Sequence, residues 1–496
     1  MEIIKNFPCL SILLCMFAAI ISSALKGRGA RWLNSFVIAA VSVLSFAVLY
    51  LTITTKESYV YVMGHFPAPF GNEIRFGSLE AGMALFFCVI MMLSLNGGRK
   101  KLLLEINPAK ENLYYIMVDL LLSSLLALVY TNDLFTAYVF VEINTISACG
   151  LIMITERGHT IEAATRYMIM SLLGSGLFLI GICLLYDLTG HLLMSNIKAG
   201  IDAIVANGTY HTPLLVTIAL IVVGLAIKSA LFPFHAWLPN AYGYSTVSSA
   251  AILSSLVSKG YIFLLIKIIY RVIGFDTFRD SKIINVLFVF GLAGMIMGSL
   301  SAIRENDIRR MISFSSVAQI GYIYMGFGLG TAVGMVASVF HMLSHAATKS
   351  LLFVSGSGLT DVSGGHKEFL ELTGSAYRNI CAGLAFTVGS LSMVGIPVFS
   401  GFVSKLLFSQ AAILNEHKVL PTLIALAIST ILNTIYFMKT VIRIYTPAHG
   451  KYASASWKEN PAYAVTLLLF IILNVVLGMC SQPITDWIAQ GLSVFA

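Results

Sequence analysis

The sequence predicts an all-α polytopic membrane protein with about fourteen transmembrane helices. Of its 496 residues, 58% are hydrophobic and only 11% are charged, and the mean hydropathy is +0.87. Soluble globular proteins are far less apolar than this. In addition, apolar runs of roughly 17 to 25 residues recur along the whole chain, and that length crosses about 30 Å of hydrocarbon.

The fourteen predicted spans follow one another with short connections. They cover residues 8–25, 33–54, 77–95, 112–130, 133–154, 166–187, 213–238, 247–270, 283–303, 311–330, 333–356, 379–414, 420–445 and 463–481. Two of them contain helix breakers. Pro233 interrupts the seventh, and Pro397, with Gly395 and Gly401, interrupts the twelfth, which is too long for one straight helix. Helices 7 and 12 are therefore expected to be discontinuous.

The basic residues indicate topology and exclude a nucleic-acid partner. The formal charge is +8, but the lysines and arginines lie in short clusters between apolar runs and form no single basic face. Loops that follow odd-numbered spans hold about twice as many of them as the other loops. By the positive-inside rule, both termini of this multi-pass cell-membrane protein are predicted on the non-cytoplasmic side.

No motif in the sequence indicates a redox centre, a metal site or a soluble catalytic domain. The cysteines are scattered singly through apolar segments, as expected of small core residues. They are Cys9, Cys15, Cys88, Cys149, Cys183, Cys381 and Cys480. Neither a Walker loop nor a GxGxxG motif after a strand occurs. We therefore expect no cofactor in this chain.

The spans can be grouped into two similar five-helix units. Spans 4 to 8 can be aligned with spans 9 to 13. Because each unit has an odd number of helices, the second unit is inserted in the membrane in the opposite orientation to the first. The predicted divisions are 1–111 for helices 1 to 3, 112–270 for the first repeat, 283–445 for the second and 446–496 for helix 14. Inverted repeats with broken helices at matching places are typical of ion sites near the membrane midplane.

Charged residues inside the spans are the candidate functional residues. Placing an ammonium at the bilayer centre costs about 2.5 to 3.5 kcal/mol on insertion scales, so Lys228 in the seventh span needs an explanation. Glu142 lies about ten residues into the fifth span. A lone carboxylate there would be neutral unless a cation lay beside it, and Lys228 is the natural partner. A purely structural ion pair between two helices is the alternative.

Further titratable residues extend this pair into a row. Lys259 lies in the eighth span and Lys405 in the twelfth, while His341, His345 and Lys349 occupy positions i, i+4 and i+8 of the eleventh. That spacing places the three on one helical face. An HxxxH pair can also bind zinc or haem, but the row favours a proton relay, because buried lysine and histidine can lose and regain protons near neutral pH.

Several other charged residues are expected nearer the membrane surface. Asp119 and Glu80 are interpreted as interfacial and solvated, and Lys267 and Lys439 as snorkelling from span ends. His235 follows the Pro233 break, where a structural role and a role in an access path are both open.

Six motifs occur in a characteristic order between residues 75 and 445. They are NDLFTAYVFVEI (132–143), KSALFPFHAWLPNAY (228–242), SKGYIFLLIK (258–267), NDIRRMISFSSVAQIGY (306–322), FHMLSHAATKSLLF (340–353) and GIPVFSGFVSKLLF (395–408). This pattern resembles the antiporter-like subunits shared by respiratory complex I, Mrp-type cation/proton antiporters and membrane-bound energy-converting hydrogenases. It looks most like the Mrp D-type subunit and its hydrogenase counterpart.

The resemblance implies roles for the residues that match. Glu142 would be the glutamate of helix 5, Lys228 its partner, Lys259 and His345 the central relay with His341 and Lys349, and Lys405 the terminal lysine near the exit. It also implies the fourteen-helix fold. The chain departs from the pattern at Asn240, where an aspartate is common, and in GYSTVSSA (243–250), where many relatives have an Ala-Pro pair.

Three functions remain open from the sequence. The first is an H⁺- or Na⁺-translocating subunit of a redox-driven complex, with other membrane subunits as partners and with Fe–S and, in a hydrogenase, NiFe centres in hydrophilic partner subunits. The second is the D-type subunit of a stand-alone Mrp antiporter with only membrane partners. The third is a secondary transporter of an organic solute, which a row of titratable residues suits poorly.

Overall fold

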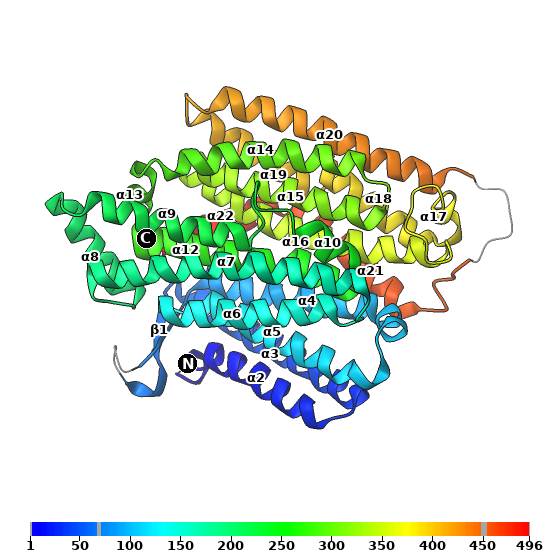
Figure 1. The fold of residues 1–496 in the computed structure, drawn as a ribbon, viewed down its shortest axis with the longest axis horizontal. Helices are drawn as coiled ribbons and strands as arrows, with labels where there is room; N and C mark the ends of the chain where they lie inside the picture. The colour runs from blue at the N-terminus through cyan, green and yellow to red at the C-terminus, as the bar shows by residue number, and fades with distance from the viewer. Residues whose placement is uncertain (1, 67–70, 448–453, 496) are drawn as a thin grey trace.

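The computed structural model describes residues 2–66, 71–447 and 454–495, and most of them are helical. The long helices lie side by side along one direction, in layers that begin with α2 and α3 and end with α20 (Figure 1). Both chain ends lie on the same side of the molecule, opposite the short helix α17, Ser375–Arg378 (Figure 1). This arrangement is that of a bundle whose helices cross a membrane together.

Within the described residues, eleven helical segments are long and apolar enough to cross a membrane. They are α2 (Phe7–Ala24), α3 (Gly27–Thr55), α4 (Ser78–Glu105), η2 with α5 (Pro108–Tyr130), α6 (Leu134–Met153), α7 (Gly158–Thr189), α9 (His211–Lys228), α11 to η4 (Val247–Ile273), α14 (Ile283–Arg304), α20 (Val419–Tyr445) and α21 (Pro461–Met479). The predicted class, an all-α polytopic membrane protein, is confirmed.

The remaining predicted spans correspond to more polar or shorter helices. They are α15 (Ile308–Gly328), α16 (Ala332–Asp361), and the pair α18 (Ile380–Val394) and α19 (Ser400–Ile413). Helices α15 and α16 are buried along almost their entire length, and their polar side chains face other helices. The number of crossings and the inverted repeats stay predictions.

Both predicted helix breaks are present. Helix α9 ends at Lys228, five residues before Pro233, and the chain makes turns until α10 (Leu238–Tyr244). Between α18 and α19, Gly395 has a φ of +92°, a conformation that favours glycine. A Cβ at this position would lie 3.0 Å from the Lys405 side chain. Glycine therefore permits both the turn and the close passage of that lysine.

The sequence interpretation did not include several short elements. They are α1 (Glu2–Lys5), the antiparallel strands β1 (Tyr59–Val62) and β2 (Glu73–Phe76) with η1 (Met63–His65) between them, α8 (Met194–Asn207), α13 (Phe275–Asp280) and α22 (Ser481–Ser493). Within the segment Val247–Ile273, α11 (Val247–Ile252) and α12 (Ser258–Ile268) alternate with the π-helical turns η3 (Leu253–Val257) and η4 (Ile269–Ile273).

Glu80 and Asp119 were expected in a solvated interface, and this expectation is wrong. Both are 0% exposed. Glu80 Oε1 accepts a hydrogen bond from Arg271 Nη2 at 2.5 Å, and the Phe495 ring stacks 4.1 Å from that guanidinium. Packing of the chain's last residues over α4 and η4 removes this pair from water, which no local sequence pattern reveals.

Lys267 was expected to snorkel, and it does not. Its Nζ is buried and donates to the carbonyl oxygens of Leu128, Val129 and Thr131, the last at 2.5 Å. These carbonyls belong to the end of α5 (Glu111–Tyr130), where a helix has unsatisfied acceptors and a partial negative charge. Lys267 therefore caps α5 from the neighbouring α12. Lys439, by contrast, is exposed.

Lys367, in the loop after α16, is expected to make the stability depend on pH. Burial of Lys367, and next the Arg309 guanidinium, lowers the pKa of this lysine to about 8, and Asp307 acts in the opposite direction. Because the folded-state pKa lies below the unfolded one, the unfolded chain binds more protons between these values, and the free energy of unfolding rises with pH across that window.

Above pH 8, the apparent melting temperature of the wild type should therefore rise more steeply with pH than that of the variant Lys367→Met. The exposed-site variant Lys100→Met should follow the wild type, and parallel curves for all three proteins would contradict the prediction.

Candidate ion-translocation site

Lys228 and Glu142 are brought together by two neighbouring helices. Lys228 is the last residue of α9 and its side chain is 1% exposed; its Nζ lies 3.6 Å from Glu142 Oε1 on α6. The same Nζ donates to Thr145 Oγ1 at 2.6 Å, one turn further along α6. The Tyr261 ring lies 5.5 Å from it. The ammonium is thus held by a hydroxyl and attracted by a carboxylate slightly beyond hydrogen-bond distance.

Glu142 is partly exposed at the surface of the chain. Its side chain is 24% exposed, although its Oε1 atom, which faces Lys228, is buried. The sequence placed Glu142 within a membrane span, and the packing of α6 decides which part of the side chain is covered. A charged carboxylate at such a position is costly against lipid unless a partner covers it.

Lys259 is positioned by an irregular helix. It follows the π-helical turn η3 and donates to the carbonyl oxygen of Ser254 at 2.5 Å and to Ser258 Oγ at 3.3 Å. A π-turn disturbs the regular hydrogen-bond ladder and is frequent at functional sites. Here it allows a side chain to reach a main-chain acceptor. The Ser254 hydroxyl also lies 3.4 Å from Ser316 Oγ of α15.

The predicted stripe of His341, His345 and Lys349 lies buried on α16. The two imidazole rings are stacked with centroids 6.0 Å apart, and none of their four nitrogens has a hydrogen-bond partner in the described part of the chain. Lys349 Nζ donates to the Ile312 carbonyl at 2.8 Å and to the Ser315 hydroxyl. The described residues include no group of three or more His, Cys, Asp or Glu side chains suited to a metal ion.

Lys405 terminates the row on the opposite side. It lies on α19, and its Nζ donates to the Val394 carbonyl at the end of α18 at 2.5 Å and to Thr430 Oγ1 on α20 at 2.9 Å. The end of a helix carries a partial negative charge that favours a cation. The break between α18 and α19 therefore supplies the ligand that holds this lysine.

Lys259, His341, His345, Lys349 and Lys405 form a series within electrostatic range of one another, and Lys228 lies beside the helix that carries Lys259, with its Nζ 5.5 Å from the Tyr261 ring of α12. His341 lies within electrostatic range of Lys259 and Lys405, and His345 within range of Lys259 and Lys349. The residues are carried by five helices of the bundle, α6, α9, α12, α16 and α19. Such a series of bases, begun by one carboxylate, can pass a proton in steps.

The sequence interpretation missed the polar side chains that hold the row. Thr145, Tyr261 and Thr430 contact Lys228 or Lys405. Thr145 could have been found, because it lies three residues after Glu142 and so shares its helical face. Thr430 lies on α20, the helix that follows α19, 25 residues after Lys405, and nothing local signals its contact.

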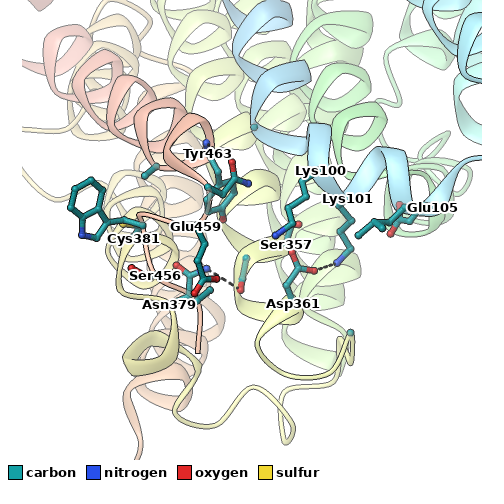
Figure 2. Close-up of a pocket in the computed structure, with 18 residues that line it drawn as sticks. Lys100, Lys101, Glu105, Ser357, Asp361, Asn379, Cys381, Ser456, Glu459 and Tyr463 are labelled. Atoms are coloured by element: carbon teal, nitrogen blue, oxygen red, sulfur yellow. Dashed lines mark hydrogen bonds and ion pairs between the residues drawn. The ribbon is translucent and has the colours of Figure 1, made fainter. Parts of the chain in front are cut away.

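A separate cavity lies at the ends of α4, α16, α18 and α21. It has a volume of about 430 Å³ and is lined in part by Lys101, Asp361, Asn379 and Tyr463, and by none of the seven row residues. Figure 2 shows Lys101 directed toward Asp361, with which it forms an ion pair of 2.6 Å. Hydrophilic side chains thus gather at the helix ends, apart from the row.

Comparison with known proteins identifies the family. Residues 131–432 match the family model described as "NADH:quinone oxidoreductase/Mrp antiporter, TM". The chain belongs to this family. It is 30% identical over 504 residues to the NADH-quinone oxidoreductase subunit N of Desulforudis audaxviator, covering 98% of both proteins. It is 24% identical over 468 residues to the D-type subunit of the Na⁺/H⁺ antiporter of Alkalihalophilus pseudofirmus, covering 93% of this chain and 90% of that protein.

Solved structures agree with this assignment. A chain of the membrane-bound sulfane sulfur reductase, an archaeal respiratory membrane complex, has a TM-score of 0.89 and 25% identity, with coverage of 100% of this chain and 98% of that one. A chain of the Mrp complex from Dietzia sp. has the same fold, with a TM-score of 0.85, 22% identity and coverage of 99% and 97%. The family resemblance found in the sequence is confirmed: this is an antiporter-like membrane subunit.

Proposed function

We propose that this subunit translocates H⁺ or Na⁺ through the row Glu142, Lys228, Lys259, His345, His341, Lys349 and Lys405, within a redox-driven complex of the complex I or energy-converting hydrogenase type. One observation carries the proposal. Besides the ion pair between Glu142 and Lys228, the bundle holds a series of titratable side chains that extends from Lys259 through His345 and His341 to Lys405. A structural ion pair would need no such continuation.

The proposed mechanism depends on the distance between Glu142 and Lys228. With the carboxylate 3.6 Å away, the ammonium is stabilised. If Glu142 withdraws or is neutralised, the charged form of Lys228 loses its partner in a low-dielectric surrounding, and its proton passes toward Lys259. The histidines then relay charge to Lys405. Return of the carboxylate resets the pair.

The partial exposure of Glu142 supports a partner subunit on that side of the chain. A carboxylate that is 24% exposed on a membrane helix is best explained by a neighbouring protein that covers it. We propose other antiporter-like and small membrane subunits as direct partners, and hydrophilic subunits with Fe–S and NiFe centres elsewhere in the complex. Both termini are proposed to lie on the non-cytoplasmic side of the cell membrane, and 112–270 and 283–445 to be the inverted repeats.

The D-type subunit of a stand-alone Mrp antiporter is the second candidate. It is favoured by the likeness of the whole chain to the D-type subunit of the Alkalihalophilus pseudofirmus Na⁺/H⁺ antiporter. The two candidates use the same residues and differ in their partners. An affinity-tagged chain, purified with its complex, should bring down subunits containing Fe–S centres if the first proposal holds. Purification of small membrane subunits alone would favour the Mrp antiporter.

Reconstitution of the purified complex into liposomes tests the relay itself. We expect Lys259→Met to reduce translocation at least about tenfold, because methionine keeps the apolar stem but cannot carry a proton. A pH-sensitive dye and radioactive Na⁺ identify the moving ion. Lys100→Met, at an exposed lysine outside the row, serves as control. Equal rates in both variants would exclude Lys259 from the path.

A further inference from the structure

A second buried carboxyl group lies outside the row and outside the residues that match the family model. Asp119 is on α5, in the N-terminal layer, and is 0% exposed. Asn34 Nδ2 of α3 donates to its Oδ1 at 2.6 Å, and the Ser22 hydroxyl of α2 faces the same carboxyl. Three helices therefore converge on this one acid.

No cation of the described chain neutralises Asp119. It takes part in none of the ion pairs between described residues. The Cys15 thiol of α2 lies within electrostatic range of Asp119, and Cys88 of α4 within range of Cys15; neither thiol provides a positive charge. A carboxylate in such surroundings is strongly destabilised unless a cation binds to it.

Three oxygen atoms at this place lack a hydrogen-bond partner within the described residues. They are Asp119 Oδ2, Asn34 Oδ1 and Ser22 Oγ, and all three side chains are 0% exposed. Buried polar atoms are nearly always satisfied in native proteins. Carboxylate, amide and hydroxyl oxygens are suitable ligands for a hard cation. Alternatively, a proton on the Asp119 carboxyl group could form a hydrogen bond between Oδ2 and a neighbouring hydroxyl.

We propose that Asp119, Asn34 and Ser22 form a second monovalent-cation site, which takes H⁺ or Na⁺ and is separate from the row. The site lies in the middle part of α5, which is 20 residues long. Asp119 is eight residues after Glu111, so it lies about 12 Å below the start of α5 at 1.5 Å per residue. There, Glu111 pairs with Arg31 at 3.2 Å, and both are partly exposed. The Arg31–Glu111 pair thus marks the nearest access from water.

Carbodiimide labelling of the assembled complex in membranes tests the site directly. Dicyclohexylcarbodiimide reacts with protonated carboxyl groups in apolar surroundings, and mass spectrometry locates the product. We expect Asp119 to be labelled in sodium-free buffer, less so as pH rises. At least fivefold protection by Na⁺ would identify Na⁺ as a ligand, whereas labelling that follows pH but ignores Na⁺ would identify a proton site.

A variant series separates cation binding from a merely structural clamp. Asp119→Asn keeps an acceptor for Asn34 but loses the charge, and Ser123→Ala removes a different hydroxyl of α5, which donates to the Ile12 carbonyl. A ligand that binds only the folded state raises the melting temperature of the complex. The melting temperatures of the wild type and of Ser123→Ala should depend on Na⁺ or on pH in the same way, and that of Asp119→Asn should not show this dependence. Identical dependence in all three proteins, together with unlabelled Asp119, would overturn the proposal without affecting the row.

Discussion

Replacement of Lys228 by alanine should reduce ion translocation by the reconstituted complex at least about tenfold, which corresponds to about 1.4 kcal/mol or more in an activation barrier. Lys228 is the only residue of the row that contacts both the Glu142 carboxylate and the Thr145 hydroxyl. Without its amine, a proton has no acceptor between α6 and α12. Proton uptake into liposomes, driven by the partner subunits or by an imposed gradient, measures the effect.

Matched variants on α6 test whether translocation depends on the charge of Glu142 or on the hydrogen bond between Lys228 and Thr145. Glu142→Gln keeps the shape of the side chain and removes its attraction for Lys228, so it should also reduce translocation strongly. Thr145→Val removes the 2.6 Å hydrogen bond but leaves the carboxylate, and a smaller loss is expected. If translocation survives both Lys228→Ala and Glu142→Ala, the relay is wrong.

Replacement of Glu80 by alanine should destabilise the protein by about 3 to 5 kcal/mol, the usual result of removing one partner of a buried ion pair. Both side chains of the Glu80–Arg271 pair are 1% exposed. Without Glu80, the guanidinium stays buried beneath Phe495 with Lys267 nearby. Unfolding in mixed micelles with increasing denaturing detergent measures the change in free energy.

Two further variants complete this test. Asp276→Ala removes the partner of an exposed pair, in which Asp276 is 79% and Arg279 47% exposed, and no measurable change is expected because such pairs contribute little. The double variant Glu80→Leu with Arg271→Met should recover much of the lost stability, since it leaves no unpaired buried charge. If the double variant loses as much stability as Glu80→Ala does, then Glu80 stabilises the protein through its packing and not through its charge.

The positions of the spans follow from the sequence because hydrocarbon imposes a simple requirement. A segment that crosses it must be long, apolar and helical, and the predicted spans therefore match observed helices closely, as 420–445 matches α20. The helix breaks could be found because proline and glycine act locally. Short interfacial elements such as α8 and the strands β1 and β2 have no equally strict requirement, and they were missed.

The depth of a charged residue could not be predicted in the same way. Glu80, Asp119 and Lys267 were placed at the surface from their positions near span ends, yet each is buried. Glu142 lies within a predicted span, and its side chain is 24% exposed. Exposure depends on which other helices cover a face, and these are distant in sequence.

The sequence by itself determined the fold class, the family and the identity of the seven titratable residues, because hydropathy, helix breakers and charges within apolar runs are local properties. Only the tertiary structure decided which of these residues meet, that Thr145 and Thr430 hold the lysines, and that Asp119 lies enclosed by three helices. The physical reason is that contacts between helices depend on their rotation and packing. An apolar sequence indicates that a helix is buried in the membrane, but it does not indicate which face of that helix lies against a neighbouring helix.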